Sequence, residues 1–390
     1  MNQANPVISK PVESGLAPSK PHRQLRASWC SLNDVNSRIE AWTHLENNAI
    51  WRNPSFEHNY LIPAIQNLGT PSIRILMVED NAADESENIV GLLPIESKYI
   101  FRLPFKCAEV WKHEHCFDAT PLLLNKFPTE AWQLICNKLA SDGYSLLSLD
   151  TVSAESSFEQ VLRQTQSNLN FHRFQRDHYE RAGFIPSASA DEYSTNFVSK
   201  SIRKNVKRLM RKLEELGDVR WECSHQQSDY DFLAAEFLRI ESSGWKGREG
   251  TALASSDETK SFYLDLIRRS ASANKARFLT LYLNDQPIAM LSDIQSGLTV
   301  YSYKTAFDDA FSQYSPGLQV EVKNIELLHR DGIEFGDSCT NPDNTTVNRI
   351  WGQKVKFQNV VFSLTPGLNR LATRLMPSVQ NAVRRFKKNK

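Results

Sequence analysis

The sequence predicts an α/β (α+β) protein of two tandem domains, each a mixed, mostly antiparallel sheet flanked by helices. Apolar positions at helical and at strand spacing alternate along the chain, and the same order of elements occurs twice. Such alternation favours a mixed sheet covered on both faces. With 390 residues, 41% of them apolar, the chain is also long enough to bury two cores of ordinary size.

The first domain is expected over residues 28–190, after a leader at 1–27 that is rich in Pro, Ser and Lys and is predicted to be disordered. Apolar spacing predicts helices at 35–45, 56–68 and 130–139, and strands at 73–78, 89–95, 108–111 and 146–150.

A basic helix is predicted to bridge the domains within 191–217. Its apolar positions step by four and three, Ser199 or Ser201 can cap its start, and Gly217 ends it. The opposite face carries Lys200, Arg203, Lys204, Lys207, Arg208, Arg211 and Lys212. This face is either a solvated surface or a region that attracts an anionic substrate.

The second domain is expected over 218–366. The same spacing predicts helices at 230–242 and 259–270, strands at 277–283 and 287–294, then a strand at 298–307, a helix at 318–331 and a closing strand at 333–337. The order of elements therefore resembles that of the first domain.

The joint between strand 298–307 and the following helix carries the most informative motif, Ser315-Pro316-Gly317. A proline in a first helical turn loses no hydrogen bond, and a glycine beside it lets a ligand approach the backbone. The free N–H groups of such a turn form an anion site that suits a phosphate-bearing cofactor. The alternative is an ordinary turn between strand and helix.

Several segments in fixed order extend this motif. They are Glu241 to Leu253 with its Gly-Trp-Lys-Gly core, Tyr303 to Asp308, Tyr314 to Gly317, Phe335 to Cys339, Pro342-Asp343 and Ile350-Trp351. In this order they resemble the GNAT-superfamily acetyltransferases associated with cellulose and exopolysaccharide biosynthesis, closely in the second half and loosely in the first. Proteins of that family look like tandem GNAT folds related to the Fem aminoacyltransferases. The resemblance implies an acyl-CoA donor, acetyl-CoA or longer, and a catalytic second domain.

The resemblance also implies roles for individual residues. Cofactor binding is expected from Tyr301, Lys304, Tyr314, Ser315, Pro316, Gly317 and Leu318. Acceptor binding is expected from Trp245, Lys246, Arg248, His113 and His115. The catalytic candidates follow from position along the predicted elements. We expect Asp337, at a strand end where a cleft would open, as the general base, with Glu241 and Glu249 as the next candidates, and Tyr303 or Tyr301 as the group that reprotonates the leaving thiolate.

Each of these roles has an alternative. Asp337 can cap the following turn instead of accepting a proton. Cys339 has no histidine in a recognisable relation to it, which argues against a covalent nucleophile. Where the family pattern leads us to expect Pro-Asp-His, this chain has Pro342-Asp343-Asn344. If that histidine takes part in catalysis in relatives, the activity of this chain is in question.

No metal is expected, because the histidines of His113-Glu114-His115-Cys116 have no second ligand pair at metal-site spacing. The six cysteines lack both CxxC spacing and the density of a disulfide scaffold, so reduced thiols are expected. No segment reaches the roughly 18 to 20 apolar residues that cross a bilayer, and the leader lacks the apolar run of a signal peptide. A cytoplasmic location is therefore expected.

The charge distribution adds a membrane hypothesis. The formal net charge is only +1, yet no Asp or Glu follows Asp343, and the segment 367–390 is a basic tail. Leu371, Leu375, Val379 and Val383 add an apolar stripe, although Pro377 interrupts it. Such a tail can lie on an anionic membrane, at the inner face of which the protein would be peripheral, or it is simply a solvated end.

The predicted function is therefore an acyl-CoA-dependent N- or O-acyltransferase that acts on an amine or hydroxyl of a sugar, a glycolipid or a cell-envelope precursor. Two alternatives remain open: a Fem-like transferase that uses aminoacyl-tRNA, and a non-catalytic GNAT-fold binding protein. Nucleic acid is not favoured as a partner, because no recognised binding motif accompanies the basic helix.

Overall fold

A computed structural model describes residues 24–99, 106–169 and 172–365. Most of the predicted leader and the tail 367–390 lie outside the described residues. Strand β1 already begins at Leu25, within the stretch predicted as leader.

In the described residues, the first half has seven strands and six α-helices, together with one short 3₁₀ helix. In chain order they are β1 (Leu25–Cys30), α1 (Leu32–Asn36), α2 (Ile39–Asn47), η1 (Pro54–Phe56), α3 (His58–Leu68), β2 (Arg74–Asp80), β3 (Ile89–Tyr99), β4 (Lys106–Val110), β5 (Leu122–Leu123), α4 (Pro128–Ser141), β6 (Leu146–Ser153), α5 (Ser157–Leu169), β7 (His172–Phe184) and α6 (Ala190–Phe197).

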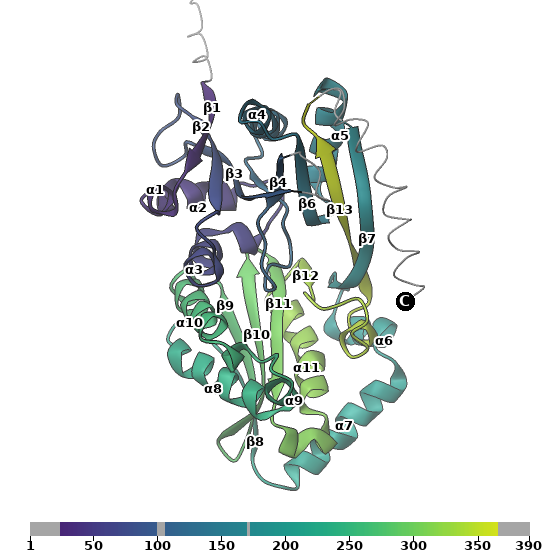
Figure 1. The fold of residues 1–390 in the computed structure, drawn as a ribbon. Coiled ribbons are helices and arrows are strands. Elements are labelled where there is room, and N and C mark those ends of the chain that lie inside the picture. The colour runs from purple at the N-terminus through teal and green to yellow at the C-terminus, as the bar shows by residue number, and fades with distance from the viewer. Residues whose placement is uncertain (1–23, 100–105, 170–171, 366–390) are drawn as a thin grey trace, which may run out of the picture.

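Helix α7 (Lys200–Glu214) leads into the second half (Figure 1). The elements that follow are β8 (Val219–Cys223), α8 (Tyr230–Ser243), α9 (Trp245–Arg248), η2 (Leu253–Ser255), α10 (Asp257–Ser272), β9 (Ala276–Leu283), β10 (Gln286–Ser296), β11 (Thr299–Phe307), η3 (Asp309–Tyr314), α11 (Pro316–Arg330), β12 (Phe335–Asp337), η4 (Val347–Arg349) and β13 (Gln353–Ser363).

The two halves repeat one plan. In the first, β1 to β4 form an antiparallel series and β4 then pairs parallel with β6. In the second, β8 to β11 form an antiparallel series and β11 pairs parallel with β12. The predicted fold class, a mostly antiparallel mixed sheet flanked by helices and repeated in tandem, is confirmed.

The two sheets are joined because the halves exchange their last strands. Strand β7, from the first half, pairs with β12 of the second, and β13, from the second half, pairs with β6 of the first. Strands β7 and β13 also pair with each other over their whole length, so the described strands form one continuous sheet. Figure 1 shows these two long strands side by side.

Helices cover both faces of the second-half sheet. On one face α8 and α10 pack against Met290, Ile294 and Tyr303. On the other face α11 and α7 pack against Leu279, Leu281 and Leu291. Neighbouring strand residues such as Met290 and Leu291 thus enter different cores, as the two-residue period of a strand requires.

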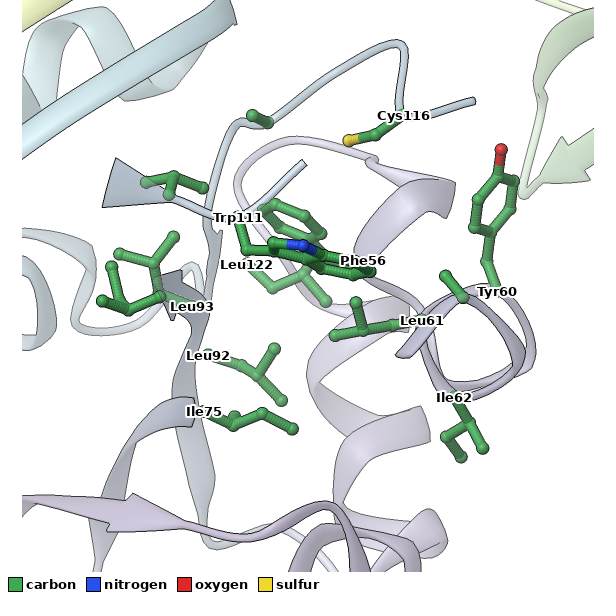
Figure 2. Close-up of a cluster of buried hydrophobic side chains, with 14 of the residues drawn as sticks. Phe56, Tyr60, Leu61, Ile62, Ile75, Leu92, Leu93, Trp111, Cys116 and Leu122 are labelled. Atoms are coloured by element: carbon green, nitrogen blue, oxygen red, sulfur yellow. The ribbon is translucent and has the colours of Figure 1, made fainter. Parts of the chain in front are cut away.

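The core of the first half is built around α3. Figure 2 shows Leu61 of α3 directed toward Leu92 of β3, with Phe56 and Trp111 close by. All four side chains are buried. The same core continues into α8 and α10 of the second half, so apolar packing as well as strand pairing joins the halves.

A buried ion cluster lies at the same junction. The ammonium of Lys275, at the start of β9, contacts Glu46 Oε2 at 3.0 Å and Glu57 Oε2 at 2.7 Å. Both carboxylates come from the first half and are fully buried. Because an unpaired buried charge is costly, this cluster helps to hold the halves in one relative orientation.

Candidate functional site

A fork between two parallel strands opens a large cavity in the described part of the chain. Strand β11 pairs with β12 only over residues 299–301, where Tyr301 lies opposite Asp337. Beyond this point the N–H of Ser338 donates to Ala182 of β7, while β11 continues to Phe307. Among the described strands none pairs with this edge of β11 past Tyr301. A cavity of about 1380 Å³ opens there.

The cavity walls come from both halves of the chain. They include the N-terminus of α7, the segment from α9 to α10, the unpaired edge of β11, the start of α11, the loop after β12 and, from the first half, Glu114, His115 and Phe117. Of the residues predicted as site residues, the lining contains His115, Trp245, Lys246, Tyr303, Lys304, Ser315, Gly317 and Leu318.

A bulge places Tyr303 at the fork. The pairing of β10 with β11 shifts by one residue here, because Ser302 faces Asp293 and Lys304 faces Ser292. The Tyr303 ring packs against His115 and Tyr263, and its buried hydroxyl has no hydrogen-bond partner. Burial raises the pKa of Tyr303 well above its ordinary value, so the phenol stays protonated and can donate a hydrogen bond.

The turn predicted as an anion site lies at the start of α11. Ser315 adopts a left-handed conformation (φ 49°, ψ 52°) just before α11, and its side chain makes no capping hydrogen bond. The first N–H groups of α11, those of Gly317 and Leu318, therefore lack a side-chain cap. A Cβ on Gly317 would lie 3.0 Å from the Phe307 ring, so the close approach of α11 to β11 depends on glycine.

Two other residues of the predicted cofactor set support this turn without lining the cavity. Pro316 is buried as the first residue of α11, and Tyr314 packs against the core under β9 and β10. Tyr301 also lies outside the cavity lining, because its buried hydroxyl donates to the Arg52 carbonyl of the first half at 2.5 Å.

Glu241 is the centre of a buried ionic network. Its Oε1 accepts from Lys304 Nζ at 2.9 Å and lies 3.3 Å from Lys246 Nζ, while Oε2 accepts from the Leu253 N–H at 2.8 Å. Burial alone would raise the pKa of Glu241, but the two lysines and the Leu253 N–H lower it overall. Glu241 is thus an anchor for two cavity lysines, and Lys304, predicted to bind the cofactor, is already paired.

The α9 loop brings the predicted acceptor residues to the rim. Trp245 lines the cavity with 46% of its surface exposed. Lys246 donates to the Thr305 carbonyl of β11 at 2.9 Å, so it closes part of the strand edge. Arg248 pairs with Asp309 at 2.7 Å and links α9 to η3 outside the lining. Glu249 ends α9 and is also absent from the lining.

The two histidines of the first half occupy different positions. His115 lines the cavity, whereas His113 packs behind it against Trp111 and Phe262, and its Nδ1 accepts from the His115 N–H at 3.3 Å. Burial lowers the pKa of His113 to about 3. Burial and, as a smaller cause, the positive charge of Lys304 lower the pKa of His115 to about 4. Both rings are therefore neutral near pH 7.

The Nε2 atom of His115 is buried at the cavity wall and has no hydrogen-bond partner. The exposed carboxylate of Glu114 lies 3.3 Å from it and opposes the lowering of the His115 pKa. A neutral imidazole atom of this kind is available to a ligand.

Asp337 occupies a structural position. Arg181 of β7 holds both of its carboxylate oxygens, and Oδ1 also accepts from the Cys339 N–H at 2.9 Å. The Asp337 side chain is absent from the cavity lining. The capping alternative describes this geometry better than the predicted role as general base, because the acceptor oxygens are already occupied.

Cys339 lines the cavity in a left-handed conformation (φ 53°), like Ser315 on the opposite side of the fork. Burial, followed by Asp337, raises the pKa of its thiol well above the ordinary value, which disfavours a nucleophilic thiolate. Two non-glycine residues with positive φ at one cavity indicate local backbone strain, which is common at functional sites.

Sequence reasoning missed Glu321 of α11 and Thr305 of β11, which both line the cavity and are joined by a 2.6 Å hydrogen bond. The sequence carried only a weak sign of a functional role for Glu321, namely that this carboxylate lies among the apolar positions of the helix that follows the Pro-Gly turn. Arg181 was missed because strand β7 itself was not predicted.

The described part of the chain holds no group of three or more His, Cys, Asp or Glu side chains arranged to bind a metal. All six cysteines are free thiols. Among the described helices, none combines the length and apolar character needed to span a bilayer.

Residues 200–344 match the family model described as Acetyltransferase (GNAT) domain. The match runs from α7 through the loop after β12 and includes the fork, the bulge at Tyr303 and the Pro-Gly start of α11. This part of the second half therefore resembles a GNAT acetyltransferase domain. No curated protein matches the sequence.

Solved structures resemble the chain over most of its length. The crystal structure of FemX is 10% identical and superposes with a TM-score of 0.52 over 85% of this chain and 96% of that one. A conserved protein of unknown function from Bacteroides thetaiotaomicron is 10% identical and superposes with a TM-score of 0.54 over 87% of this chain and 100% of that one.

A third structure is the C-terminal domain (DUF2156) of an Agrobacterium fabrum protein assigned as a lysylphosphatidylglycerol synthetase. It is 11% identical, with a TM-score of 0.50 over 88% of this chain and 96% of that one. At such identities these likenesses show a shared fold alone.

Proposed function

We propose that the protein is an acyltransferase that moves an acyl group from acyl-CoA to an amine or hydroxyl of a sugar, a glycolipid or a cell-envelope precursor. The observation that carries this proposal is the cavity of about 1380 Å³. It extends from the start of α11, which has no side-chain cap, along the unpaired edge of β11 to a wall of polar side chains. A long, anionic donor and a polar acceptor could meet there at the Tyr303 bulge.

The donor's pyrophosphate would lie on the first turn of α11. The helix dipole contributes only about 0.3 to 1 kcal/mol at an exposed site, so hydrogen bonds from the N–H groups of Gly317 and Leu318 must supply more. The pantetheine arm would follow the edge of β11 toward Tyr303. Lys304 is held by Glu241 and is therefore assigned to the wall of the site and not to the phosphates.

Acyl-CoA supplies the activated thioester, and the chain would position the acceptor and move its proton. Trp245 at the rim offers an aromatic face, and the Lys246 ammonium beside it offers hydrogen-bond donors. The neutral His115 Nε2 can accept a hydrogen bond from the acceptor. The protonated Tyr303 hydroxyl can donate to the departing sulfur.

A role in exopolysaccharide biosynthesis is our proposal from the resemblance of the second-half motifs. A cytoplasmic location, peripheral at the inner face of the membrane, is proposed from the basic tail alone. No contact among the described residues favours an aminoacyl-tRNA donor or a purely binding role, so neither is adopted.

Substitution of Ser315 tests the donor site. Aspartate and asparagine both tolerate the left-handed conformation and both cap helices well, so Ser315→Asp and Ser315→Asn should be at least as stable as the wild type. Only aspartate places a negative charge at the phosphate position. Calorimetric titration with acetyl-CoA should show at least tenfold weaker binding to Ser315→Asp and near wild-type binding to Ser315→Asn.

Equal affinity of acetyl-CoA for both folded variants would remove the site from the start of α11. Absence of acetyl-CoA binding to the wild type would overturn the proposed function.

A further inference from the structure

Glu321 is a buried carboxyl group at the cavity wall. It lies five residues after Pro316 on α11, or about 7.5 Å further along the helix axis. Its side chain is 3% exposed and contributes to the lining between the α11 start and the Tyr303 bulge. It is therefore positioned beside the middle of any ligand that extends from the α11 turn to the bulge.

Only one of the two carboxyl oxygens has a partner. Oε1 accepts from the Thr305 hydroxyl at 2.6 Å, whereas Oε2 is buried without a hydrogen-bond partner. A buried polar atom without a partner is costly, and in native structures it often marks a site where a ligand supplies the missing contact.

No basic side chain of the described chain forms an ion pair with Glu321. The charge that acts on its pKa is that of Asp293 of β10, which is buried and is itself paired with Arg277 of β9 at 3.3 Å. Burial, followed by Asp293, raises the pKa of Glu321 to about 7, against the opposing hydrogen bond from Thr305.

The remaining charged or titratable groups lie elsewhere on the cavity wall. They are Glu114 and His115 from the first half, Lys246 on α9, Tyr303 and Lys304 on β11, and Cys339, Asp343 and Arg349 after β12. Both lysines are paired with Glu241. No positive charge in the described surroundings therefore stabilises the ionised form of Glu321. The negative charge of incoming donor phosphates would disfavour that form further.

We propose that Glu321 binds the arm of the acyl-CoA donor as a neutral carboxylic acid, with the proton on Oε2 donated to an amide carbonyl of the arm. This inference rests on the proposed function, since it requires a thioester donor that follows β11. Donor binding then takes up a proton at neutral pH. The residue acts in donor positioning and takes no part in bond making or breaking.

The test is calorimetry of acetyl-CoA with the full chain at pH 6.0, 7.0 and 8.5, in two buffers of different ionisation enthalpy. Wild-type affinity should fall about tenfold or more between pH 6.0 and 8.5, with net proton uptake on binding at pH 8.5. Glu321→Gln keeps a neutral donor at this position and should retain the affinity seen at pH 6.0 while losing most of the pH dependence.

The donor's own phosphate also titrates near pH 6, but it does so with every variant and cancels in the comparison. Glu326→Gln, on the exposed side of the same helix, should behave like the wild type. Thr305→Val removes the hydrogen bond that favours the carboxylate and should shift the loss of affinity to higher pH.

Two results would overturn the inference alone: the same pH dependence in wild type and Glu321→Gln, or wild-type affinity that rises with pH, as a carboxylate acceptor would require. Absence of acetyl-CoA binding at any pH would overturn it together with the proposed function.

Discussion

Arg181 of β7 and Asp337 of β12 form a bidentate ion pair, with Nε–Oδ1 and Nη2–Oδ2 distances of 2.6 and 2.5 Å. The pair joins the halves, because β7 belongs to the first half and β12 to the second. Both side chains are almost fully buried, and Arg181 also donates to the Phe117 carbonyl beside the cavity. It therefore fixes the point at which β11 and β12 diverge.

Asp337→Asn should destabilise the protein by about 3–5 kcal/mol, because it leaves the Arg181 charge buried without its partner. Urea unfolding measures this loss, with Asp343→Asn, an exposed acid of the cavity lining, as the matched control. The Asp343 variant should lie within about 0.5 kcal/mol of the wild type.

The reverse pattern would return Asp337 to a catalytic role. Loss of a general base predicts a variant with unchanged stability and unchanged acetyl-CoA affinity whose turnover is about 10² times slower or more, because general-base assistance contributes about 10² to 10⁴ to the rate.

Trp245→Ala should raise the KM for the acceptor about tenfold and leave acetyl-CoA affinity unchanged, because Trp245 lies at the rim and not at the α11 turn. Phe232→Ala is the matched control, since Phe232 is similarly exposed (51% against 46%) but is absent from the lining. Initial rates with glucosamine as amine probe and glucose as hydroxyl probe provide the measurement. A similar effect of both substitutions would exclude Trp245 as an acceptor contact.

The buried histidines should make stability depend on pH. The pKa values of His113 and His115 fall to about 3 and about 4, so in the window from pH 6.5 to 5 the unfolded state binds protons that the folded state does not. Stability therefore decreases as the pH falls through this window, by about 1.5–2 kcal/mol per histidine.

His113→Asn keeps an acceptor for the His115 N–H and should flatten this slope, whereas His225→Asn, in an exposed loop, should not. Urea titrations at pH 6.5, 5.8 and 5.0 compare the three proteins. An unchanged slope in His113→Asn would show that the ring can become protonated in the folded state.

Local sequence patterns located many of the elements. The predicted strand at 298–307, the Pro-Gly turn and the helix at 318–331 correspond to β11, the start of α11 and its body. The basic helix matches α7, with Ile202, Leu209 and Leu213 buried and its lysines exposed. These predictions succeed because the periodicity of apolar residues in a helix or a strand can be recognised within a short segment of sequence.

The strand exchange could not be predicted in this way. Strand β7 carries polar and charged residues along most of its length, because much of it is only partly buried, and so it shows no clean alternation. Strand β13 pairs with β6 about 200 residues away, and a local period carries no information about its partner. The same limit applies to Asp337: the sequence showed its position at a strand end but not its partner on β7.

The basic tail allows a final prediction about location. It lies outside the described residues, so the expectation rests on the sequence, in which no acid follows Asp343. Each basic residue close to an anionic surface contributes on the order of 1 kcal/mol, and salt screens the attraction. Full-length protein should sediment with vesicles containing anionic lipid at low salt and be released as salt rises.

Deletion of residues 377–390 should abolish this binding and leave transfer to a soluble acceptor unchanged, because the cavity elements end before the tail. Replacement of Lys204, Lys207 and Lys212 of α7 by Gln is the matched control. These lysines are exposed and form no ion pair with a carboxylate among the described residues. If the α7 variant lost vesicle binding and the deletion variant kept it, the membrane-binding surface would be assigned to α7 and not to the tail. No binding of full-length protein even at low salt would leave the tail as a solvated end.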